Sequence, residues 1–361
     1  MSGVVDVVEV VGPAIGGIRQ HVTELVRHAR GAGVVVTVVG PSIPGGVEVD
    51  VPLELGGPGR PWRLRRAASV LGDQPGGLVH AHGMTAGWTA VAARRLGSGP
   101  LAARPIVLTA HNVVLGRSAL RRLERPLYRR CDLVIAPSPA IARRVRALAP
   151  QTQVVEIVPT FPMPTPVRTR AAVRDELGVG VDRPLVVIPA RLHPQKDHDT
   201  MLRAIASITG ERPGLSVVVV GDGPDSGRVR RLIDELDLAD VVIMTGHRSD
   251  VADVMVAADV VLCGSIWEAV PLVVLEAMLL GVAVVSSDVG IVGELVDDAG
   301  PVLTVVPIGD VAAMAAALAG LIDDPAGRQV LAERGRSLAA TRFSPSGLAG
   351  SVLALYAEVS T

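Results

Sequence analysis

Short runs of β-branched residues alternate with helical patterns from one end of the chain to the other. One helical face carries Ile18, Val22 and Leu25, and another carries Met201 and Ile205. This alternation predicts an α/β protein in which helices cover both faces of parallel sheets. We expect strands at residues 4–11, 34–39, 77–80, 105–109 and 132–135 in the first half, and at 185–189, 216–220, 241–244, 258–263 and 282–286 in the second.

Prolines divide the chain near its middle. Four of them fall within the eight residues from Pro159 to Pro166, and such a stretch can form neither a helix nor a central strand. Because 361 residues exceed one ordinary core, we expect two α/β domains joined by this linker. A cleft is expected between the carboxyl ends of their strands. A last helical pattern follows a break at residues 343–345.

Composition excludes several classes of protein. The net charge of −1 gives no field that would attract nucleic acid. Cys131 and Cys263 both lie beside apolar runs, which indicates no disulfide framework and fits a reducing cytoplasm. Charges interrupt the run at residues 4–11 and no basic segment precedes it, so it predicts a strand and not a signal peptide. No apolar stretch reaches membrane-spanning length without a charge, and we expect a soluble, cytoplasmic protein.

Lysine occurs once, at position 196, although the chain has 35 cationic residues. A composition that supplies arginine at every other cationic position suggests that this position requires a compact ammonium group. Lys196 follows Arg191 at the end of an expected strand, where α/β folds place ligand chemistry. We therefore predict a functional role for Lys196.

Two glutamates follow the expected strand at residues 258–263. Glu268 lies in a short polar turn, and Glu276 lies in the helical pattern that follows it. Pro271 suits the first position of that helix, and the free N–H groups there favour an anion. Carboxylates beside an anion site would accept hydrogen bonds from ligand hydroxyl groups, as on sugars. Taken alone, the pair could equally be a solvated loop residue and a helix surface residue.

The run from Ser265 to Met278 resembles the E-x7-E motif of retaining GT-B glycosyltransferases of glycosyltransferase family 4 (glycosyl transferase group 1). The resemblance covers nearly the whole chain. Two departures stand out: Val270 replaces a common aromatic residue, and Val289 interrupts a usual glycine pair. The other segments that carry the resemblance, in order, are residues 16–22 (GGIRQHV), 79–83 (VHAHG), 109–112 (TAHN), 136–138 (APS), 191–197 (RLHPQKD), 219–224 (VVGDGP) and 246–247 (GH).

The resemblance implies two Rossmann-like domains that face each other across a cleft. The N-terminal, acceptor-side domain would span residues 1–162, with a C-terminal helix at 345–361 packing back on it. The C-terminal domain, residues 163–344, would bind a nucleotide-diphospho-sugar. The reaction would move a hexosyl group to a sugar, lipid-linked or phosphorylated acceptor, without a metal or other cofactor.

The resemblance also implies roles for individual residues on the donor side. Arg191 and Lys196 would neutralise the diphosphate of the leaving nucleotide. Glu268 would bind the transferred sugar, and Glu276 the ribose hydroxyls. Backbone N–H groups near Val270, Pro271 and Leu272 would assist Glu268, and the backbone at Gly246, His247 and Arg248 would meet the base.

In the first half, the resemblance places His111 near the anomeric carbon. Gly16 and Gly17 would allow the backbone to approach the diphosphate or the acceptor closely.

Metal sites are the first alternative. His80 and His82 alternate at a strand end and could bind a metal ion together with His111. We see no carboxylate or cysteine partner near them in the sequence and expect no metal. The D-x-D pattern at residues 197–199 falls at a helix start, where Asp197 is expected to be an ordinary cap.

Two further alternatives concern the type of function. Gly221 and Gly223 follow a strand as in a nicotinamide-binding fingerprint, although the third glycine, Gly227, comes one residue late. An NAD-dependent oxidoreductase is therefore the alternative enzyme. A non-catalytic sugar-nucleotide-binding protein on the same fold is the other.

The arginine-rich stretches at residues 60–66 and 117–130 could contact an anionic membrane, a polyanionic acceptor or only solvent. The apolar face that follows the first stretch is mostly alanine, which favours a helix docked on its own sheet.

Overall fold

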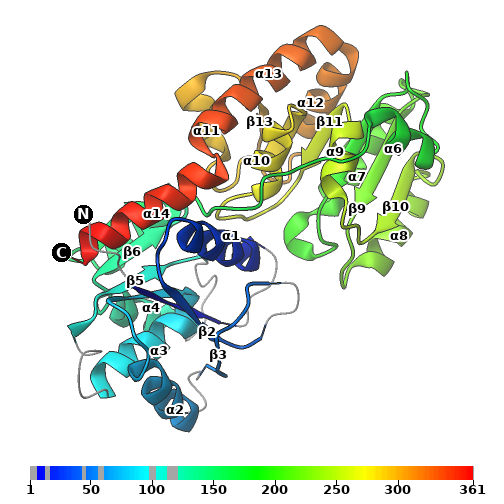
Figure 1. Ribbon diagram of the computed structural model, residues 1–361. Helices are drawn as coiled ribbons and strands as arrows, with labels where there is room; N and C mark the ends of the chain where they lie inside the picture. Colours follow the sequence, from blue (N-terminus) through cyan, green and yellow to red (C-terminus); the bar gives the residue numbers. More distant parts are fainter. Residues whose placement is uncertain are drawn as a thin grey trace. The chain divides into compact units, whose positions relative to one another are not determined.

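The computed structural model describes residues 6–12, 17–42, 46–55, 61–96, 103–111 and 121–360. The chain divides into two compact units. Unit 1 comprises Met1–Pro162 and Ser344–Thr361, and unit 2 comprises Met163–Phe343. Each unit is an α/β layer structure in which helices pack on a parallel sheet (Figure 1).

The described part of unit 1 contains a seven-stranded, fully parallel sheet with the order β3-β2-β1-β4-β5-β6-β7. Its central strands are buried along their whole length, as expected when helices cover both faces. The strands are β1 (Val7–Val11), β2 (Val36–Gly40), β3 (Val51–Pro52), β4 (Leu78–His82), β5 (Ile106–Thr109), β6 (Leu133–Ala136) and β7 (Gln153–Glu156).

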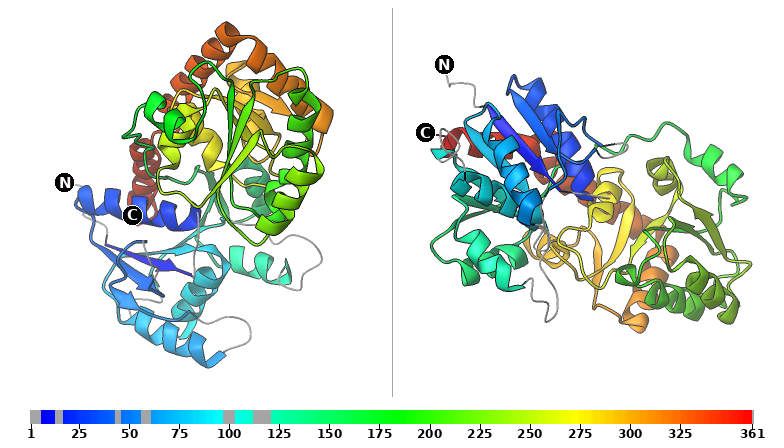
Figure 2. Two further views of the ribbon diagram at one scale, coloured as in Figure 1. Left: turned by 90° about the vertical axis from the view of Figure 1, so that its right-hand side faces the viewer. Right: turned by 90° about the horizontal axis from the view of Figure 1, so that it is seen from below.

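The helices of unit 1 come from both ends of the chain. The C-terminal helix α14 (Pro345–Val359) lies alongside α1 (Gly17–Gly31), as Figure 2 shows in two views. Val352 and Tyr356 of α14 pack in one core with strand residues of the sheet, among them Val107. The remaining helices are α2 (Pro61–Gly72), α3 (Gly83–Leu96), α4 (Arg121–Tyr128) and α5 (Pro139–Leu148).

The described part of unit 2 contains a six-stranded parallel sheet with the order β10-β9-β8-β11-β12-β13. Its strands are β8 (Leu185–Pro189), β9 (Ser216–Val220), β10 (Val242–Gly246), β11 (Val260–Cys263), β12 (Ala283–Ser287) and β13 (Thr304–Val306). Its helices are α6 (Arg170–Glu176), η2 (Pro194–Lys196), α7 (His198–Thr209), α8 (Ser226–Glu235), α9 (Val251–Ala257), α10 (Leu272–Leu279), α11 (Val292–Ala299), α12 (Val311–Asp323) and α13 (Pro325–Arg342).

Both sheets reverse their strand order at one point. The reversal falls between β1 and β4 in unit 1, and between β8 and β11 in unit 2. At each reversal, the helices that follow the two adjacent strands cover opposite faces of the sheet. The carboxyl ends of β1 and β4, and those of β8 and β11, therefore each border a crevice of the kind in which α/β proteins bind ligands. Two places in the molecule are therefore candidates for chemistry.

Each of the ten predicted strands coincides with a strand of the structure, and the helical faces at Ile18 and Met201 lie on α1 and α7. Residues 157–167, which include the proline-rich segment, have neither helix nor strand. Both cysteines are buried and free. Three strands went unpredicted: β3, β7 and β13. No helix in the described ranges is both long and apolar enough to cross a membrane.

Candidate functional site

In unit 2, the loop after β8 and the loop after β11 are joined by backbone and amide hydrogen bonds. The N–H of Ile266 donates to the carbonyl oxygen of Gln195 over 2.9 Å, and the Gln195 side chain donates to the carbonyl oxygen of Trp267 over 2.7 Å. The 3₁₀ turn η2 ends at Lys196, and Asp197, whose backbone is left-handed (φ 48°), is the N-cap of helix α7. These contacts hold η2, and the lysine at its end, against the glutamate loop.

Lys196 and Glu268 form an ion pair across these two loops. The Ser265 hydroxyl donates to the same carboxylate over 3.1 Å. The side chains of the pair are only 18% and 14% exposed, so solvent screens their attraction less than at an open surface. The structure thus brings together two residues that the sequence singled out separately.

Arg191 lies five residues before Lys196 and is exposed. Within the described ranges, no hydrogen bond or ion pair engages its guanidinium group. An exposed cation beside a paired one, at the end of β8, leaves a positive charge available to an anionic ligand.

Helix α10 begins at Leu272, with Pro271 as the residue before it. The predicted placement of Pro271 as the first helical residue was therefore wrong by one position. Its fixed backbone torsion still suits the entry to the helix, and no side chain caps the first turn. The N–H of Val274 donates to the carbonyl oxygen of Pro271 over 2.9 Å, and the N–H groups of Leu272 and Val273 have no partner among the described residues and remain available for an anion.

Glu276 lies one turn further along α10 and is half-buried. Its carboxylate makes no hydrogen bond or ion pair to another described residue, although its backbone carbonyl oxygen accepts from the N–H of Leu280. Burial raises its pKa to about 7, because removing a carboxylate from water disfavours the charged form. A ligand hydroxyl that donates to Glu276 would restore the ionised form.

The loop from Asp288 passes close to the glutamate loop at Gly290. This residue has a φ of 62°, and a Cβ there would lie 2.4 Å from the carbonyl oxygen of Ala269. Glycine is therefore required at position 290 although Val289 interrupts the glycine pair expected from the resemblance. The close approach supports the backbone beside Glu268.

The segment after β10 presents its backbone and not its arginine. Gly246 has a φ of 71°, and its carbonyl oxygen accepts a hydrogen bond from the N–H of Gly221 over 2.8 Å. His247 is exposed. The Arg248 guanidinium donates to Asp250 over 2.6 Å and to Glu176 over 2.8 Å, so it is already engaged.

The glycines of the nicotinamide-like pattern have a packing role. A Cβ at Gly221 would lie 2.1 Å from the carbonyl oxygen of Ala190, and one at Gly223 would lie 2.3 Å from that of Leu192. Both glycines follow β9, whereas a dinucleotide fingerprint follows the first strand of its unit, here β8. They allow the loop that carries Arg191 to pack closely, and they do not support the oxidoreductase alternative.

In unit 1, a buried polar cluster lies at the junction of β1 and β4. Its members are all below 7% exposed and come from β1, α1, β4, β5, the loop after β5, and α14. They are Glu9, His21, His80, His82, Thr109, His111 and Tyr356. The sequence analysis missed Glu9, which contacts His82 (Oε2 to Nε2, 2.7 Å). The expectation that no carboxylate accompanies these histidines was therefore wrong. The signal was a lone acidic residue in an apolar strand, where a buried charge needs partners.

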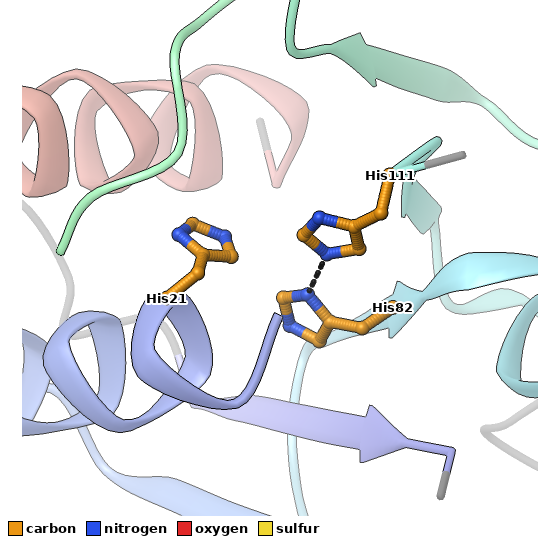
Figure 3. Close-up of side chains that lie close together, drawn as sticks. All are labelled: His21, His82 and His111. Atoms are coloured by element: carbon orange, nitrogen blue, oxygen red, sulfur yellow. Dashed lines mark hydrogen bonds between the residues drawn. The ribbon is translucent and has the colours of Figure 1, made fainter. Parts of the chain in front are cut away.

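His111 follows β5 and forms a hydrogen bond with His82 (Nε2 to Nδ1, 3.1 Å), drawn as the dashed line in Figure 3. His21 extends from α1 toward both rings, with centroids 5.2 Å from His111 and 5.5 Å from His82. Neither nitrogen of His21 has a hydrogen-bond partner among the described residues. Burial, and then the neighbouring histidines, hold the pKa of both His21 and His111 well below the usual value.

This cluster contains two sets of three residues that are close enough together to bind a metal ion. The potential ligand atoms of His21, His82 and His111 lie within 4.8 Å of one another, as do those of Glu9, His80 and His82. Both nitrogens of His82 are already hydrogen-bonded, one to Glu9 and one to His111. The rings therefore satisfy one another in their present positions, and a metal ion would have to break the contact between His82 and His111.

The other residues predicted from the sequence lie outside these two groups of side chains. Gly17 opens helix α1 and is exposed, whereas Gly16 lies outside the described residues. Asp197 caps α7, accepting from the N–H of Thr200, as expected. In α2, Ala67, Ala68 and Leu71 are buried within unit 1, in agreement with a docked helix. Arg65 and Arg66 are exposed and available to an anionic partner.

Comparison with known proteins matches both halves of the chain. Residues 15–161 match the model of Glycosyltransferase Family 4, and residues 169–338 match that of Glycosyl transferases group 1. A GDP-mannose-dependent alpha-(1-6)-phosphatidylinositol monomannoside mannosyltransferase from Mycolicibacterium smegmatis is 30% identical over 358 residues, which cover 90% of each chain.

Other relatives match in part or in fold. An alpha-D-kanosaminyltransferase from Streptomyces kanamyceticus is 31% identical over 53% of this chain, and the match spans only 49% of that relative's length. HepE from Anabaena, solved with UDP, superimposes with a TM-score of 0.83 over 98% of this chain and 100% of its own, at 20% identity. The lipopolysaccharide glycosyltransferase WaaG gives a TM-score of 0.75 at 19% identity, over 97% and 99% of the two chains.

The mannosyltransferase match spans most of both proteins at an identity that indicates common ancestry, and the two family models divide the chain between them. The structural matches agree in fold with the two parallel-sheet units. The chain belongs to the GT-B glycosyltransferases, with a family 4-type N-terminal half and a group 1 C-terminal half.

Proposed function

We propose that this glycosyltransferase moves a hexosyl group from a nucleotide-diphospho-sugar to its acceptor with retention of anomeric configuration and without a metal ion. The observation that carries the proposal is the ion pair between Lys196 and Glu268 at the junction of β8 and β11, with an exposed Arg191 five residues before Lys196 in the loop that follows β8. This arrangement offers cations for a diphosphate and a carboxylate for a sugar.

Arg191 and Lys196 neutralise the charge that develops on the nucleotide as it leaves. Fixed cations aimed at a developing charge stabilise the transition state without the reorganisation that water would need. The first-turn N–H groups of α10 add to this field. Together these groups supply the electrophilic assistance that a divalent cation provides in other enzymes.

The two glutamates bind hydroxyl groups on either side of the diphosphate. Glu268, with the backbone at Val270, Pro271 and Leu272, binds the transferred sugar. Glu276 accepts from the ribose, because it has no described protein partner and its pKa of about 7 allows ionisation near neutrality.

The base meets the backbone of Gly246, His247 and Arg248, because the Arg248 side chain is occupied by Asp250 and Glu176.

Residues of unit 1 complete the assignment. His111 contacts the transferred sugar or the acceptor, and Gly16 and Gly17 approach the diphosphate or acceptor through their backbone. Residues 1–162 with the C-terminal helix form the acceptor-side domain, and residues 163–344 the donor-side domain. The acceptor is a sugar, lipid-linked or phosphorylated compound; the mannosyltransferase relative, whose name includes a phosphatidylinositol monomannoside, motivates the lipid-linked class.

The stereochemistry of the product tests this function. The protein is incubated with UDP-, GDP- and ADP-sugars in the presence of EDTA, with phosphatidylinositol monomannoside and simple sugars as acceptors. Proton NMR then reports the anomeric configuration of the new glycosidic bond. Retention in EDTA supports the proposal, and inversion or a strict metal requirement contradicts it. Nucleotide sugars that bind but are never consumed would instead favour the non-catalytic binding protein.

A further inference from the structure

A chain of hydrogen bonds leads from the centre of strand β1 to His111. Glu9 Oε2 lies 2.7 Å from His82 Nε2, and His82 Nδ1 lies 3.1 Å from His111 Nε2. Glu9 is fully buried, and the two histidines are 4% and 6% exposed. Water is thus largely excluded from the chain, and each contact must be made by a proton that one of these three residues carries.

At the other end of this series of hydrogen bonds, Glu9 is held by a residue of the C-terminal helix. The Tyr356 hydroxyl, on α14, donates to Glu9 Oε1 over 2.7 Å. His80 Nδ1 lies 2.6 Å from that hydroxyl and 3.3 Å from Glu9 Oε2. Both carboxylate oxygens therefore face donors, which is the environment that keeps a buried carboxylate ionised.

The ionised carboxylate of Glu9 determines which ring nitrogen of each histidine carries a proton. An ionised Glu9 can only accept, so His82 must carry its proton on Nε2. A neutral His82 then has a bare Nδ1, which can only accept. The contact between the two histidines therefore requires a proton on His111 Nε2, and the Nδ1 of a neutral His111 is left without one. No described residue is hydrogen-bonded to that Nδ1 atom.

The pKa shifts of Glu9, His82 and His111 agree with this arrangement of protons. Burial alone would raise the pKa of Glu9, but His80 and His82 together hold it far below its usual value. Burial, and after it the electrostatic effect of the neighbouring His80, lowers the pKa of His82 to about 4, despite the opposing effect of Glu9. Burial and the other histidines lower the pKa of His111 as well. At neutral pH, Glu9 is therefore an ionised carboxylate, and His82 and His111 are neutral rings.

We propose that Glu9 and His82 are positioning residues that fix His111 as its Nε2–H tautomer, so that His111 presents Nδ1 as a hydrogen-bond acceptor. The functional consequence rests on the proposed role of His111 at the reacting sugar. A bare Nδ1 accepts a hydrogen bond from a sugar hydroxyl group, whereas the opposite tautomer would donate one. Glu9 thus selects which kind of ligand group His111 can bind.

The tautomer can be measured directly in the ligand-free protein. Long-range ¹H–¹⁵N spectra of the full chain labelled at its eight histidines distinguish the Nε2–H from the Nδ1–H form. His82→Gln and His111→Gln spectra assign the signals. We expect Nε2–H at both His82 and His111 near pH 7. A proton on His111 Nδ1 would overturn the proposal, because it would mean that His82 is charged and donates to His111.

The Glu9→Gln variant tests whether the carboxylate sets this state. An amide can donate as well as accept, so we expect the Nδ1–H form of His111 to become populated. Turnover should fall on the order of 10²-fold with little change in donor KM, since disturbing the tautomer of an active-site histidine costs up to ~10⁴ elsewhere. Retention of the pure Nε2–H form at His111 would overturn the role of Glu9.

Glu124→Gln is the matched control, because Glu124 is equally buried in unit 1 but pairs with Arg144 and not with a histidine. It should leave the histidine signals of the wild type unchanged, and a tautomer shift in this control would contradict the proposal. The spectra need neither donor nor acceptor. The spectra can therefore overturn the proposed tautomer of His111 while glycosyl transfer is confirmed, and they can support the tautomer while glycosyl transfer is refuted.

Discussion

The ammonium group of Lys196 pairs with the carboxylate of Glu268 although 72 residues separate them in the chain. Two parallel strands, β8 and β11, end side by side and deliver the two residues to one place. Hydrogen bonds from Ile266 and Gln195 join their loops independently of the charges. The pair is thus positioned before a ligand binds, which is the condition for electrostatic catalysis.

Replacing the lysine tests its role at the leaving group. Lys196→Ala should lower kcat on the order of 10²–10³-fold, the scale for one preorganised donor at a developing charge. Arg203→Ala, which removes an exposed cation of α7 paired with Asp199, is the control and should leave kcat unchanged. Steady-state kinetics with the best donor measures both. A loss of tenfold or less in Lys196→Ala contradicts the assigned role.

The two glutamates should separate in their kinetic effects. Glu268→Ala should reduce turnover more than nucleotide affinity, because we propose that Glu268 binds the sugar that is transferred in the reaction. Glu276→Ala should do the reverse, because the ribose does not react. Calorimetric titration with the nucleoside diphosphate, alongside kcat, distinguishes them. Equal effects of both variants on both quantities would argue against this division.

Nucleotide affinity should depend on pH through Glu276. Its pKa is raised to about 7 by burial, so it is mostly protonated below that pH and mostly ionised above it. The ionised form accepts hydrogen bonds from the ribose hydroxyls more strongly, because the protonated form is neutral and uses one of its oxygens as a donor. Affinity should therefore increase from about pH 6 to about pH 8, and Glu276→Gln should remove this increase. An affinity that is flat or falling over this range in the wild type would disagree with the assignment.

Metal removal should have no effect. We propose that Arg191 and Lys196 neutralise the diphosphate in place of a metal ion, and both nitrogens of His82 are already engaged by Glu9 and His111. We expect the same kcat and melting temperature before and after EDTA treatment. A stabilisation by added Zn²⁺ that disappears in His21→Ala would show instead that the histidine cluster binds a metal.

Periodicity was sufficient for the main strands because they are long apolar runs. It failed at β7, where Gln153 and Glu156 flank two valines that are only half-buried, and at β13, which has three residues. The placement of Lys196 and Glu268 after the carboxyl ends of β8 and β11 could be predicted, because each residue follows a recognisable strand. The hydrogen bond between Glu9 and Tyr356 could not be predicted, because 347 residues separate the two and no local pattern connects them.

We propose that Arg191 and Lys196 bind the diphosphate of a nucleotide-diphospho-sugar. A thermal-shift panel of UDP-, GDP- and ADP-sugars, with NADH for comparison, tests this binding, since binding to the folded state raises the melting temperature by mass action. We expect at least one nucleotide sugar to stabilise the wild type, Lys196→Ala to weaken this stabilisation, and NADH to have no effect. Stabilisation by NADH alone would contradict the proposal.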